Sequence, residues 1–362
     1  MHGADTVSDS SREELVTVVV PARNEERFLP ACLDSILAQG YPALQVLVVD
    51  GASTDRTAEI VREYAARDSR VELLSNPEQI IPVSLNLALA AARGRWLVRV
   101  DAHATVPSDY VSIAVGHLRT GRWAAVGGRK DGVGLTPAGR AIAGVMTSRL
   151  GVGNSVYHYG TAPQPVEHVP FGAYSVEIAR SLGGWDPRLR VNQDFEFDYR
   201  LRQAGHELLF DPRLTIHWYC RQSVPDLYRQ YRRYGRGKVR VARLHPQSLS
   251  LRHLAAPSLV AVLAAAAAAA PRRPAVAALL VSPYVLLLGP GSEHLRRDVD
   301  VEARRWVVPA LAAMHVGWGV GFWQGVADMV RDGGRSELAS SPLSPMVRSH
   351  GDREPTAEIV AS

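Results

Sequence analysis

The sequence predicts an α/β protein whose sheet is doubly wound and largely parallel, followed by a set of strongly apolar helices. Between residues 15 and 128, short apolar runs alternate with helical patterns over short connections, which is typical of a parallel α/β sheet. Beyond residue 245, charged residues become scarce in three long segments. A chain of 362 residues is long enough to bury a sizeable core in one or two domains.

Five segments have the pattern of strands in such a sheet. They span residues 15–21, 44–51, 71–75, 95–102 and 122–128. The first two, LVTVVVP and LQVLVVDG, are nearly continuous apolar runs, as expected of strands that are covered on both faces. We therefore expect them to be buried strands.

Three helices are expected between these strands, because apolar residues recur there at helical spacing. They span residues 24–40, 53–67 and 82–94. Gly40 and Gly94 stand where a glycine commonly ends a helix. Ser53 or Asp55 is placed to cap the second helix, since a side-chain oxygen can accept from the first unpaired backbone N–H groups.

Three segments toward the C-terminus contain almost no charged residues. They span residues 254–271, 274–291 and 305–330. Roughly 20 apolar residues in a helix cross the ~30 Å hydrocarbon core of a bilayer, a length that the third segment meets and the first two nearly meet. Residues 246–331 are therefore predicted to form membrane helices, the alternative being a buried helical subdomain. A spanning hairpin of the first two segments would place Arg272 and Arg273 outside, against the positive-inside tendency, and a re-entrant or interfacial hairpin avoids this conflict.

The net charge of +5 is distributed unevenly along the chain. Residues 221–243 hold eight Lys or Arg side chains and a single acid, Asp226, with tyrosines interleaved. Such a block suits an anionic partner such as phosphate, nucleic acid or lipid headgroups. Because apolar segments follow it, we interpret residues 225–243 as a basic interfacial helix on an anionic membrane surface, with no nucleic acid as partner.

The two ends of the chain, residues 1–14 and 332–362, are polar and are expected to be disordered. The first of them lacks a basic region followed by an apolar run, so no signal peptide is predicted. Cys32 and Cys220 lie far apart in the sequence, which disfavours a disulfide framework and makes a reducing compartment the default.

Polar groups follow three of the predicted strands at the point where each strand ends. These groups lie in Pro21–Glu25, Asp50–Asp55 and Asp101–His103. Ligands in open α/β sheets bind beyond the carboxyl ends of the strands, so this coincidence predicts one shared site. Asp50 could accept from a base N–H or a ribose hydroxyl, and Arg23 could approach a diphosphate. The alternative is that Asp50 and Asp55 merely cap the next helix.

Two common phosphate-binding motifs are missing from the sequence. Neither GxGxxG nor GxxxxGK[ST] occurs, and these motifs supply the backbone cradles of dinucleotide and Walker-type sites. Sites of those two kinds are therefore disfavoured.

The stretch LVRVDAHATVP contains Asp101 and, two residues later, His103. A divalent cation such as Mg²⁺ or Mn²⁺ prefers oxygen ligands and usually also binds substrate phosphates, where it can stabilise a departing diphosphate. Asp101 suits this role directly. His103 is compatible with Mn²⁺ but is a poor Mg²⁺ ligand, so it could instead hydrogen-bond a phosphate or be an ordinary structural histidine.

Three acids stand at the start of a predicted helix in VNQDFEFDYRLRQAG, namely Asp194, Glu196 and Asp198. Removal of a proton from a nucleophilic hydroxyl requires a carboxylate within about 2.6–3.2 Å of it. Asp194 is the first choice for this base and Glu196 is its rival. The alternative is that acids at this position only complement the helix dipole.

These stretches together resemble an inverting glycosyltransferase of family 2. The resemblance rests on VVVPARNEERFLPACLDSILAQ, on VVDGASTDRTAEIV, on the strand end at Asp101 and on GGWDPRLRVNQDFEFDYRLRQAG. The DAHA tetrad and RQYRRYGRGK are more narrowly similar to bacterial exopolysaccharide transferases of the succinoglycan type. The resemblance covers residues 15–245 and implies a GT-A fold, a doubly wound, Rossmann-like mixed sheet, with a nucleotide-binding half at 15–128 and an acceptor half at 129–245.

The resemblance also implies which residues bind the donor and which one is the base. The nucleotide sugar would be bound by Pro21, Arg23, Glu25, Asp50, Ser53 and Asp101. Asp194 would be the general base that deprotonates the acceptor hydroxyl. The family usually has Glu-Asp where this chain has Gln193–Asp194, a change that keeps the base but removes a neighbouring charge.

The acceptor and metal sites follow from the same resemblance. Trp185 would be a stacking platform for the acceptor sugar, unless it is an ordinary core aromatic, and Glu196 would lie beside it. The metal would be held by Asp101 and His103. His217, in LTIHWYC, is a further metal candidate because some relatives of this fold supply a late histidine.

The predicted activity is transfer of a sugar, with inversion, from a nucleotide-sugar donor (a UDP-sugar in our expectation) to a polyprenyl-linked glycan in exopolysaccharide or cell-envelope polysaccharide synthesis. Mg or Mn would be the cofactor. Membrane lipids would be partners, and the catalytic domain would lie on the cytoplasmic side of the cytoplasmic membrane. Two alternatives stay open: a polyprenyl-phosphate glycosyltransferase, whose anionic nucleophile needs no base, and a non-catalytic nucleotide-sugar-binding membrane subunit.

Overall fold

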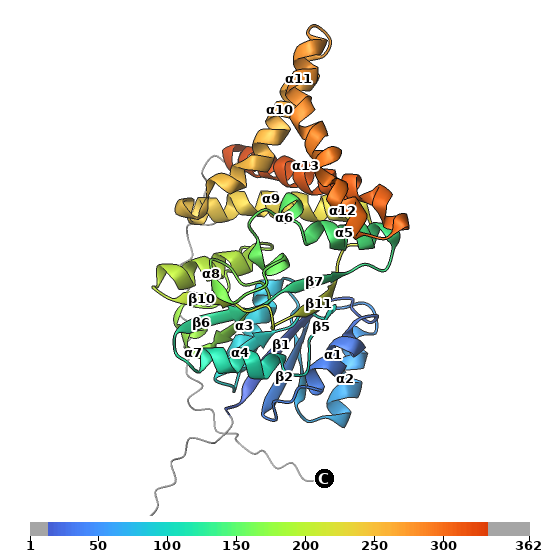
Figure 1. The fold of residues 1–362 in the computed structure, drawn as a ribbon. Coiled ribbons are helices and arrows are strands. Elements are labelled where there is room, and N and C mark those ends of the chain that lie inside the picture. The colour runs from blue at the N-terminus through green and yellow to red at the C-terminus, as the bar shows by residue number, and fades with distance from the viewer. Residues whose placement is uncertain (1–13, 332–362) are drawn as a thin grey trace, which may run out of the picture.

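The computed structural model describes residues 14–331, so nearly all of the two segments for which disorder is predicted lies outside the described residues. Glu14 is the exception, because it accepts a hydrogen bond from the Trp96 indole over 2.9 Å. The described chain thus begins one residue before the predicted boundary. Figure 1 shows three tiers, namely an α/β domain, a layer of long helices across it, and a helical hairpin that stands away from both.

The first half of the main sheet is parallel, as predicted. It consists of β1 (Val16–Ala22), β2 (Leu44–Asp50), β3 (Val71–Ser75) and β4 (Trp96–Arg99). These strands lie in the order β3-β2-β1-β4, and the register pairs Ala22 with Asp50 and Val19 with Arg99. The carboxyl ends of β1, β2 and β4 are therefore neighbours, and the polar groups expected to form one site follow these ends.

The second half of the sheet is mixed. Beyond β4 lie β9 (Ala173–Ser175), β6 (Trp123–Gly127), β10 (Glu207–Phe210) and β8 (Gln164–Val166), with β9 and β8 antiparallel to their neighbours. A smaller sheet contains β5 (Ala104–Thr105), β11 (Ile216–Tyr219) and β7 (Lys130–Val133). Because β5 follows closely after the end of β4, this small sheet borders the expected site.

Helices cover both faces of the main sheet. Their bounds are α1 (Leu29–Leu37), α2 (Thr57–Arg67), α3 (Ile81–Ala91), α4 (Tyr110–Leu118), α5 (Pro137–Met146), α6 (Arg149–Val152), α7 (Val176–Ser181) and α8 (Gln193–Gln203), with a 3-10 turn at Val156–His158. Alternate residues of β1 face opposite sides of the sheet. Val18 belongs to the core formed with α1, α2 and α4, whereas Val19 belongs to the core formed with α3 and α7.

Several predicted helix boundaries differ from the observed ones. α1 spans Leu29–Leu37 rather than 24–40. α2 begins at Thr57 rather than at Ser53, because Ser53 Oγ and Asp55 Oδ2 accept from the loop that follows β1. Asp55 nevertheless acts as one of the two predicted caps, since its Oδ1 accepts from the backbone N–H of Thr57 over 3.0 Å. α3 ends before Gly94. A Cβ at Gly94 would lie 2.5 Å from the carbonyl oxygen of Leu15, so this glycine permits a close approach of two chain segments rather than ending a helix.

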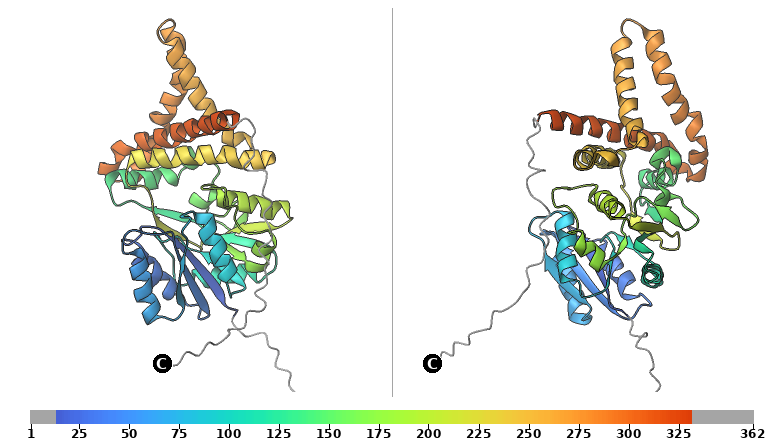
Figure 2. Two further views of the ribbon diagram at one scale, coloured as in Figure 1. Left: turned by 180° about the vertical axis from the view of Figure 1, so that it is seen from behind. Right: turned by 90° about the vertical axis from the view of Figure 1, so that its left-hand side faces the viewer.

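The C-terminal helices form the two upper tiers. Their bounds are α9 (Val224–Leu244), α10 (Ala255–Ala269), α11 (Pro274–Leu288), α12 (Glu293–Asp298) and α13 (Val301–Arg331), with 3-10 turns at Pro246–Ser248, Leu251–Leu254 and Pro290–Ser292. Figures 1 and 2 show α9 and α13 side by side across the α/β domain, and α10 and α11 as the hairpin. α13 runs across the base of that hairpin.

Three helical stretches are long and apolar enough to cross a membrane, and they span Leu251–Ala269, Pro274–Asp298 and Val301–Arg331. In the first two stretches, 11% and 6% of the most apolar window is buried inside the protein, whereas in the third stretch 50% of that window is buried. By length, the third apolar segment is the most suitable membrane span and the first two are marginal. The structure shows a different distribution, since the hairpin is bare and α13 packs on the rest of the protein.

Glycines allow the close contact between α9 and α13. A Cβ at Gly235 would lie 2.0 Å from the Trp318 carbonyl oxygen, and a Cβ at Gly321 would lie 1.9 Å from the Arg232 carbonyl oxygen. Backbone atoms cannot turn aside as the end of a side chain can, so helices come this close where small residues face the partner helix. α13 is therefore fixed to α9 by backbone contact.

We expect Gly321→Ala to destabilise the protein by about 1–3 kcal/mol, because the new methyl group overpacks a backbone contact. Gly116→Ala in α4 is the matched control, since nothing lies within 4 Å of its Cβ position. Alanine is the better helix former there, so this change should be neutral or stabilise by up to about 1 kcal/mol. Thermal unfolding of the detergent-purified proteins measures both, and equal melting temperatures would contradict the packing argument.

Candidate active site

Two loops that leave neighbouring strand ends are joined by hydrogen bonds. They follow β1 and β2. The backbone N–H of Asn24 donates to Ser53 Oγ over 2.9 Å, and that of Thr54 donates to Asn24 Oδ1 over 2.8 Å. The backbone N–H of Glu26 donates to Asp55 Oδ2 over 3.1 Å. These bonds lock the two loops into one polar rim above the sheet.

Asp50 ends β2 at the foot of this rim. It is 8% exposed, and its carboxylate accepts from the backbone N–H of Ser53 over 3.2 Å. It therefore orders its own loop and does not cap α2. Arg23 is exposed and Pro21 is partly buried at the end of β1. The structure thus brings together four of the residues predicted to bind the donor, namely Pro21, Arg23, Asp50 and Ser53. Their contact with a nucleotide stays a prediction.

A buried arginine joins two carboxylates that lie far apart in the sequence. Arg99 is the last residue of β4 and is 3% exposed. Its Nε donates to Asp101 Oδ1 over 2.7 Å, and its Nη1 lies 2.6 Å from both oxygens of Asp194. Burial opposes protonation of Arg99, but Asp101 and Asp194 outweigh it and raise the pKa above the usual arginine value. The predicted metal carboxylate and the predicted base are thus held by one cation.

A second cation lies close to these carboxylates. The Nζ of Lys130, in β7, lies 4.2 Å from the ring centre of Trp218 and 4.5 Å from that of Phe171. Burial lowers the pKa of Lys130 to about 8, although the charge of Asp101 acts in the opposite direction. Phe171 adopts φ 52°, a left-handed conformation that is strained for an aromatic residue. Backbone strain of this kind is concentrated at functional sites.

His103 is held by another residue of the predicted site. Its Nδ1 lies 3.0 Å from Glu25 Oε1. With the proton on Nδ1, the ring donates to the carboxylate and Nε2 keeps a free lone pair. Metal-binding histidines commonly have this arrangement, in which the second ring nitrogen donates to a carboxylate. The pairing therefore favours a functional imidazole over an ordinary structural one.

Asp101 and His103 are the residues that could hold a divalent cation. Asp101 Oδ1 is engaged by Arg99 over 2.7 Å, whereas Oδ2 has a longer contact of 3.3 Å and keeps more of its capacity as a ligand. Within residues 14–331, no three His, Cys, Asp or Glu side chains form a ready cage for an ion. Mg²⁺ commonly needs one or two carboxylates when substrate phosphates supply further ligands. The residues present thus fit an ion that is shared with a diphosphate.

His217 lies in β11, where its backbone pairs with Thr105 of β5. Its side chain is exposed, and across the part of the chain that the structure covers, no hydrogen bond or ion pair links it to Asp101 or His103. The small sheet therefore brings His217 near the strand that follows the site without joining it to the predicted metal ligands.

Two residues predicted at the acceptor site are structural instead. Trp185 is 0% exposed and its ring centre lies 4.5 Å from that of Phe197, so it has no face to offer a sugar. Glu196 is 1% exposed, with Arg200 Nε at 2.7 Å and His245 Nε2 at 2.9 Å. Burial opposes ionisation of Glu196, but these hydrogen bonds outweigh it and lower the pKa. Glu196 is therefore committed to internal ion pairs and is not a free base.

The basic helix α9 lies over the loop that presents the predicted base. Asn192, two residues before Asp194, donates from Nδ2 to the backbone oxygen of Tyr234 over 3.0 Å. Lys238 does not face a membrane surface as the interfacial interpretation requires. Its ammonium points inward and donates to the Ser248 carbonyl oxygen over 2.9 Å, and burial lowers its pKa to about 7. α9 is thus a structural support of the site as well as a carrier of exposed arginines.

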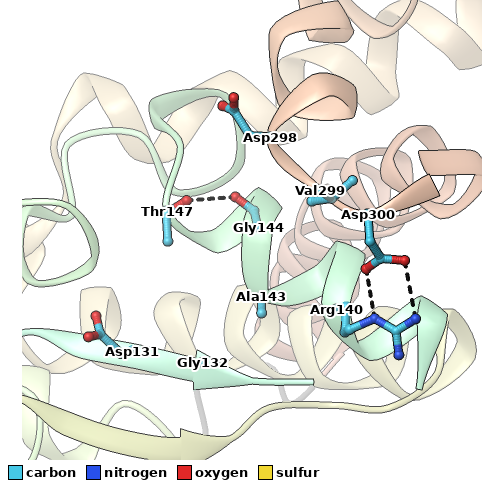
Figure 3. A pocket seen from close by; sticks show the side chains of 9 residues that line it. All are labelled: Asp131, Gly132, Arg140, Ala143, Gly144, Thr147, Asp298, Val299 and Asp300. Carbon is cyan, nitrogen blue, oxygen red and sulfur yellow. Dashed lines mark hydrogen bonds and ion pairs between the residues drawn. The ribbon is translucent and has the colours of Figure 1, made fainter. Parts of the chain in front are cut away.

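A separate cavity of about 410 Å³ lies between β7, α5 and the residues that join α12 to α13 (Figure 3). At its edge, Arg140 Nε lies 2.7 Å from Asp300 Oδ2. Neither Asp101 nor Asp194 lines this cavity. We therefore interpret it as part of the seam where α13 attaches to the α/β domain.

Sequence analysis missed three residues of this centre, namely Arg99, Lys130 and Phe171. The arginine in WLVR ends an otherwise apolar strand, and a buried cation requires an anionic partner, so the sequence does hold a signal for Arg99. Lys130 and Phe171 carry no comparable signal in the sequence. Lys130 reaches the centre because β7 belongs to the small sheet, and Phe171 because it lies in the segment that leads into β9.

The strand order, with a parallel half-sheet joined to a mixed half, is that of a GT-A fold, the fold of many glycosyltransferases. Residues 17–182 match the model of the family described as glycosyl transferase family 2. The succinoglycan biosynthesis protein ExoA of Rhizobium meliloti is 31% identical over 333 residues, which cover 90% of this chain and 98% of that protein. The chain therefore belongs to glycosyltransferase family 2, as the sequence resemblance predicted.

Two further proteins are similar to this chain, one in sequence and one in fold. The dolichyl N-acetyl-α-D-glucosaminyl phosphate 3-β-D-2,3-diacetamido-2,3-dideoxy-β-D-glucuronosyltransferase of Methanococcus voltae is 25% identical over 233 residues, or 62% of this chain and 72% of that protein. The mannosyltransferase PcManGT from Pyrobaculum calidifontis, solved with GDP-Man and Mn²⁺, superposes with a TM-score of 0.63 at 22% identity, covering 90% of this chain and 91% of that one. At that identity, the likeness establishes the fold.

We expect His103→Ala to weaken Mn²⁺ binding in the presence of UDP by about 10–100-fold, the range typical of groups that orient or complete a metal site. Glu25→Gln should weaken it less, because the imidazole remains. His217→Ala is the comparison variant and should bind Mn²⁺ as the wild type does. Titration of free Mn²⁺ by electron paramagnetic resonance measures all three, and a greater loss in His217→Ala than in His103→Ala would reverse our assignment.

Proposed function

We propose that this enzyme transfers a sugar, with inversion, from a nucleotide-sugar donor to a hydroxyl of a lipid-linked glycan in polysaccharide synthesis. The observation that carries the proposal is the placement of Asp101 and Asp194 on the buried Arg99, because it sets a base beside the predicted donor site. The extent of the ExoA match supports a role in polysaccharide synthesis. A UDP-sugar as donor and a polyprenyl carrier are the expectations that we retain from the sequence resemblance.

The proposed reaction is a single displacement at the anomeric carbon. The acceptor oxygen attacks that carbon while Asp194 takes the hydroxyl proton. The bond from the anomeric carbon to the donor phosphate oxygen breaks, and its electron pair leaves with the nucleoside diphosphate. The loop rim with Asp50 and Arg23 would orient the nucleotide. A divalent ion held by Asp101 and His103 would stabilise the charge of the departing diphosphate.

We further propose that the α10–α11 hairpin inserts into the membrane. Leu279 is 72% exposed and Leu286 is 60% exposed, and a soluble surface seldom bears so large an apolar face. The stretch Leu251–Ala269 has 19 residues, which corresponds to about 28 Å of helix, close to the ~30 Å hydrocarbon core. Arg272 and Arg273 at the tip would then reach the opposite headgroups by extending their side chains. In this arrangement α13 lies along the surface, and the α/β domain faces the cytoplasm.

We expect Asp194→Asn to lower kcat by about 10²–10⁴-fold, the range for loss of a general base. The donor KM should change little, since Asp194 faces the acceptor. Radiolabelled sugar transfer from UDP-sugars to membrane lipid extract, with Mn²⁺, measures the effect. Full transfer by Asp194→Asn onto a bare lipid phosphate would instead favour the alternative in which the nucleophile is already anionic.

Glu196→Gln is the matched comparison for the rival acid on the same helix. It should retain most of its kcat but lower the free energy of unfolding by about 3–5 kcal/mol, the usual effect of breaking a buried ion pair. Thermal unfolding and the same transfer assay separate these effects. If Glu196→Gln stayed folded but lost transfer while Asp194→Asn kept it, the two roles would have to be exchanged.

The paired change Leu279→Asp and Leu286→Asp should release the protein from membranes, because each charge placed in a hydrocarbon core costs about 2.5–3.5 kcal/mol. Leu135→Asp is the control, since Leu135 is 46% exposed but lies in the α/β domain. Flotation with liposomes measures attachment. Wild-type flotation of the paired variant would contradict insertion of the hairpin.

A further inference from the structure

We propose that Arg99 is a positioning residue that holds Asp194, the proposed base, in a fixed relation to Asp101, the proposed donor-side carboxylate. This inference rests on the proposed function and deepens it. It concerns a residue to which neither the sequence resemblance nor the expected site assigned a role. The supporting observations are the geometry of Arg99, the way in which Arg99 itself is held, and the direction in which charge moves during the reaction.

The guanidinium of Arg99 binds carboxylates from two different elements of the fold. Nη1 serves Asp194, which lies on α8 and is 95 positions away in the sequence. Nε and Nη2 serve Asp101, directly after β4. A guanidinium is planar and presents its N–H groups in a fixed fork, so the two carboxylates cannot rotate independently while both are bound. A lysine ammonium could neutralise one carboxylate but could not impose this shared plane.

Arg99 is itself held in place on several sides. Its backbone N–H donates to the Gly172 carbonyl oxygen over 3.2 Å, and its guanidinium carbon lies 5.2 Å from the ring centre of Phe171. The ammonium of Lys130 packs on the same ring. Phe171 keeps its strained φ of 52°, and such strain persists where the surroundings over-determine a residue. A residue with a strained backbone, Phe171, therefore helps to fix the position of Arg99.

The position of Arg99 between Asp101 and Asp194 suits the way in which charge moves during the proposed reaction. In the proposed displacement, a proton neutralises Asp194 while negative charge appears on the departing diphosphate, on the side of Asp101. Arg99 contacts the carboxylates on both sides, so a fixed positive charge faces the negative charge both at the start and at the end. A preorganised dipole or charge of this kind needs no rearrangement during the reaction.

The test compares Arg99→Gln with Arg99→Lys and with a matched arginine outside the centre. Arg129 provides the match, because it binds Asp131, also two residues away, through Nε at 2.8 Å and Nη2 at 3.0 Å. Among residues 14–331, no second carboxylate forms an ion pair with Arg129. Arg99→Gln should lower kcat about 100-fold, the scale of a misplaced catalytic group. The Michaelis constant for the donor should change far less. Arg99→Lys should recover part of the loss, and Arg129→Gln should keep wild-type kcat.

A double-mutant cycle distinguishes positioning from a general loss of structure. If Arg99 acts through Asp194, adding Arg99→Gln to Asp194→Asn should cause little further loss of kcat, since coupled residues are non-additive. Melting temperature and UDP binding, measured on every variant, identify any that is unfolded. Should Arg99→Gln fail to fold, Arg99→Lys replaces it. Its kcat is then compared with that of the wild type, and the double-mutant cycle is measured between Arg99→Lys and Asp194→Asn.

Two results would overturn the inference. One is a folded Arg99→Gln that transfers sugar as well as Arg129→Gln does. The other is full additivity of the losses from Arg99→Gln and Asp194→Asn. A folded wild type that transfers no sugar from any nucleotide donor would instead overturn the proposed function, so the two failures are distinguishable.

Discussion

The ion pairs of Arg99 with Asp101 and Asp194 are the interaction on which the active site depends. A guanidinium at the end of a buried strand loses its hydration, at a cost of several kcal/mol that ionised partners must offset. Asp101 alone lies within the same loop, and the second partner has to come from α8. The start of α8 is therefore drawn to the carboxyl end of β4, which closes the acceptor half of the domain onto the nucleotide half.

The immediate surroundings of Arg99 are close to electrical balance. Arg99 pairs with Asp101 and Asp194, and the charge of Lys130 also interacts with both, so two positive groups oppose two negative ones. A nucleotide-sugar diphosphate brings about two negative charges, and a divalent ion compensates them. The charges added by the donor and the ion would thus nearly cancel, which matters in a site where burial makes any uncompensated charge expensive. Lys130 packs on the rings of Phe171 and Trp218, and burial lowers its pKa to about 8.

Sequence patterns predicted the parallel half of the fold and the polar strand ends, because both follow from local periodicity and from the rule that strand ends meet at one edge. They also placed Asp101 and Asp194 in one site, although through the resemblance to a family. Local sequence patterns could not show whether the side chains of Trp185 and Glu196 face a ligand or pack inside the protein. Whether an aromatic ring stacks on a sugar or on Phe197 depends on contacts between distant segments, and Glu196 is occupied by His245, which arrives from beyond α9. Nor could composition foresee that half of the apolar window of α13 packs on the rest of the protein, because hydropathy does not distinguish an apolar face covered by lipid from one covered by protein.

The membrane tier and the catalytic centre are connected through α9. One side of this helix receives α13 at Gly235, and its Tyr234 carbonyl receives the side chain of Asn192, just before Asp194. α13 cannot leave α9 to cross a bilayer without breaking backbone contacts along its length, whereas the hairpin has few protein contacts to lose. Under the proposed insertion of the hairpin, these contacts would fix the plane of α13 and α9, and with it the height of Asp194 relative to the membrane surface.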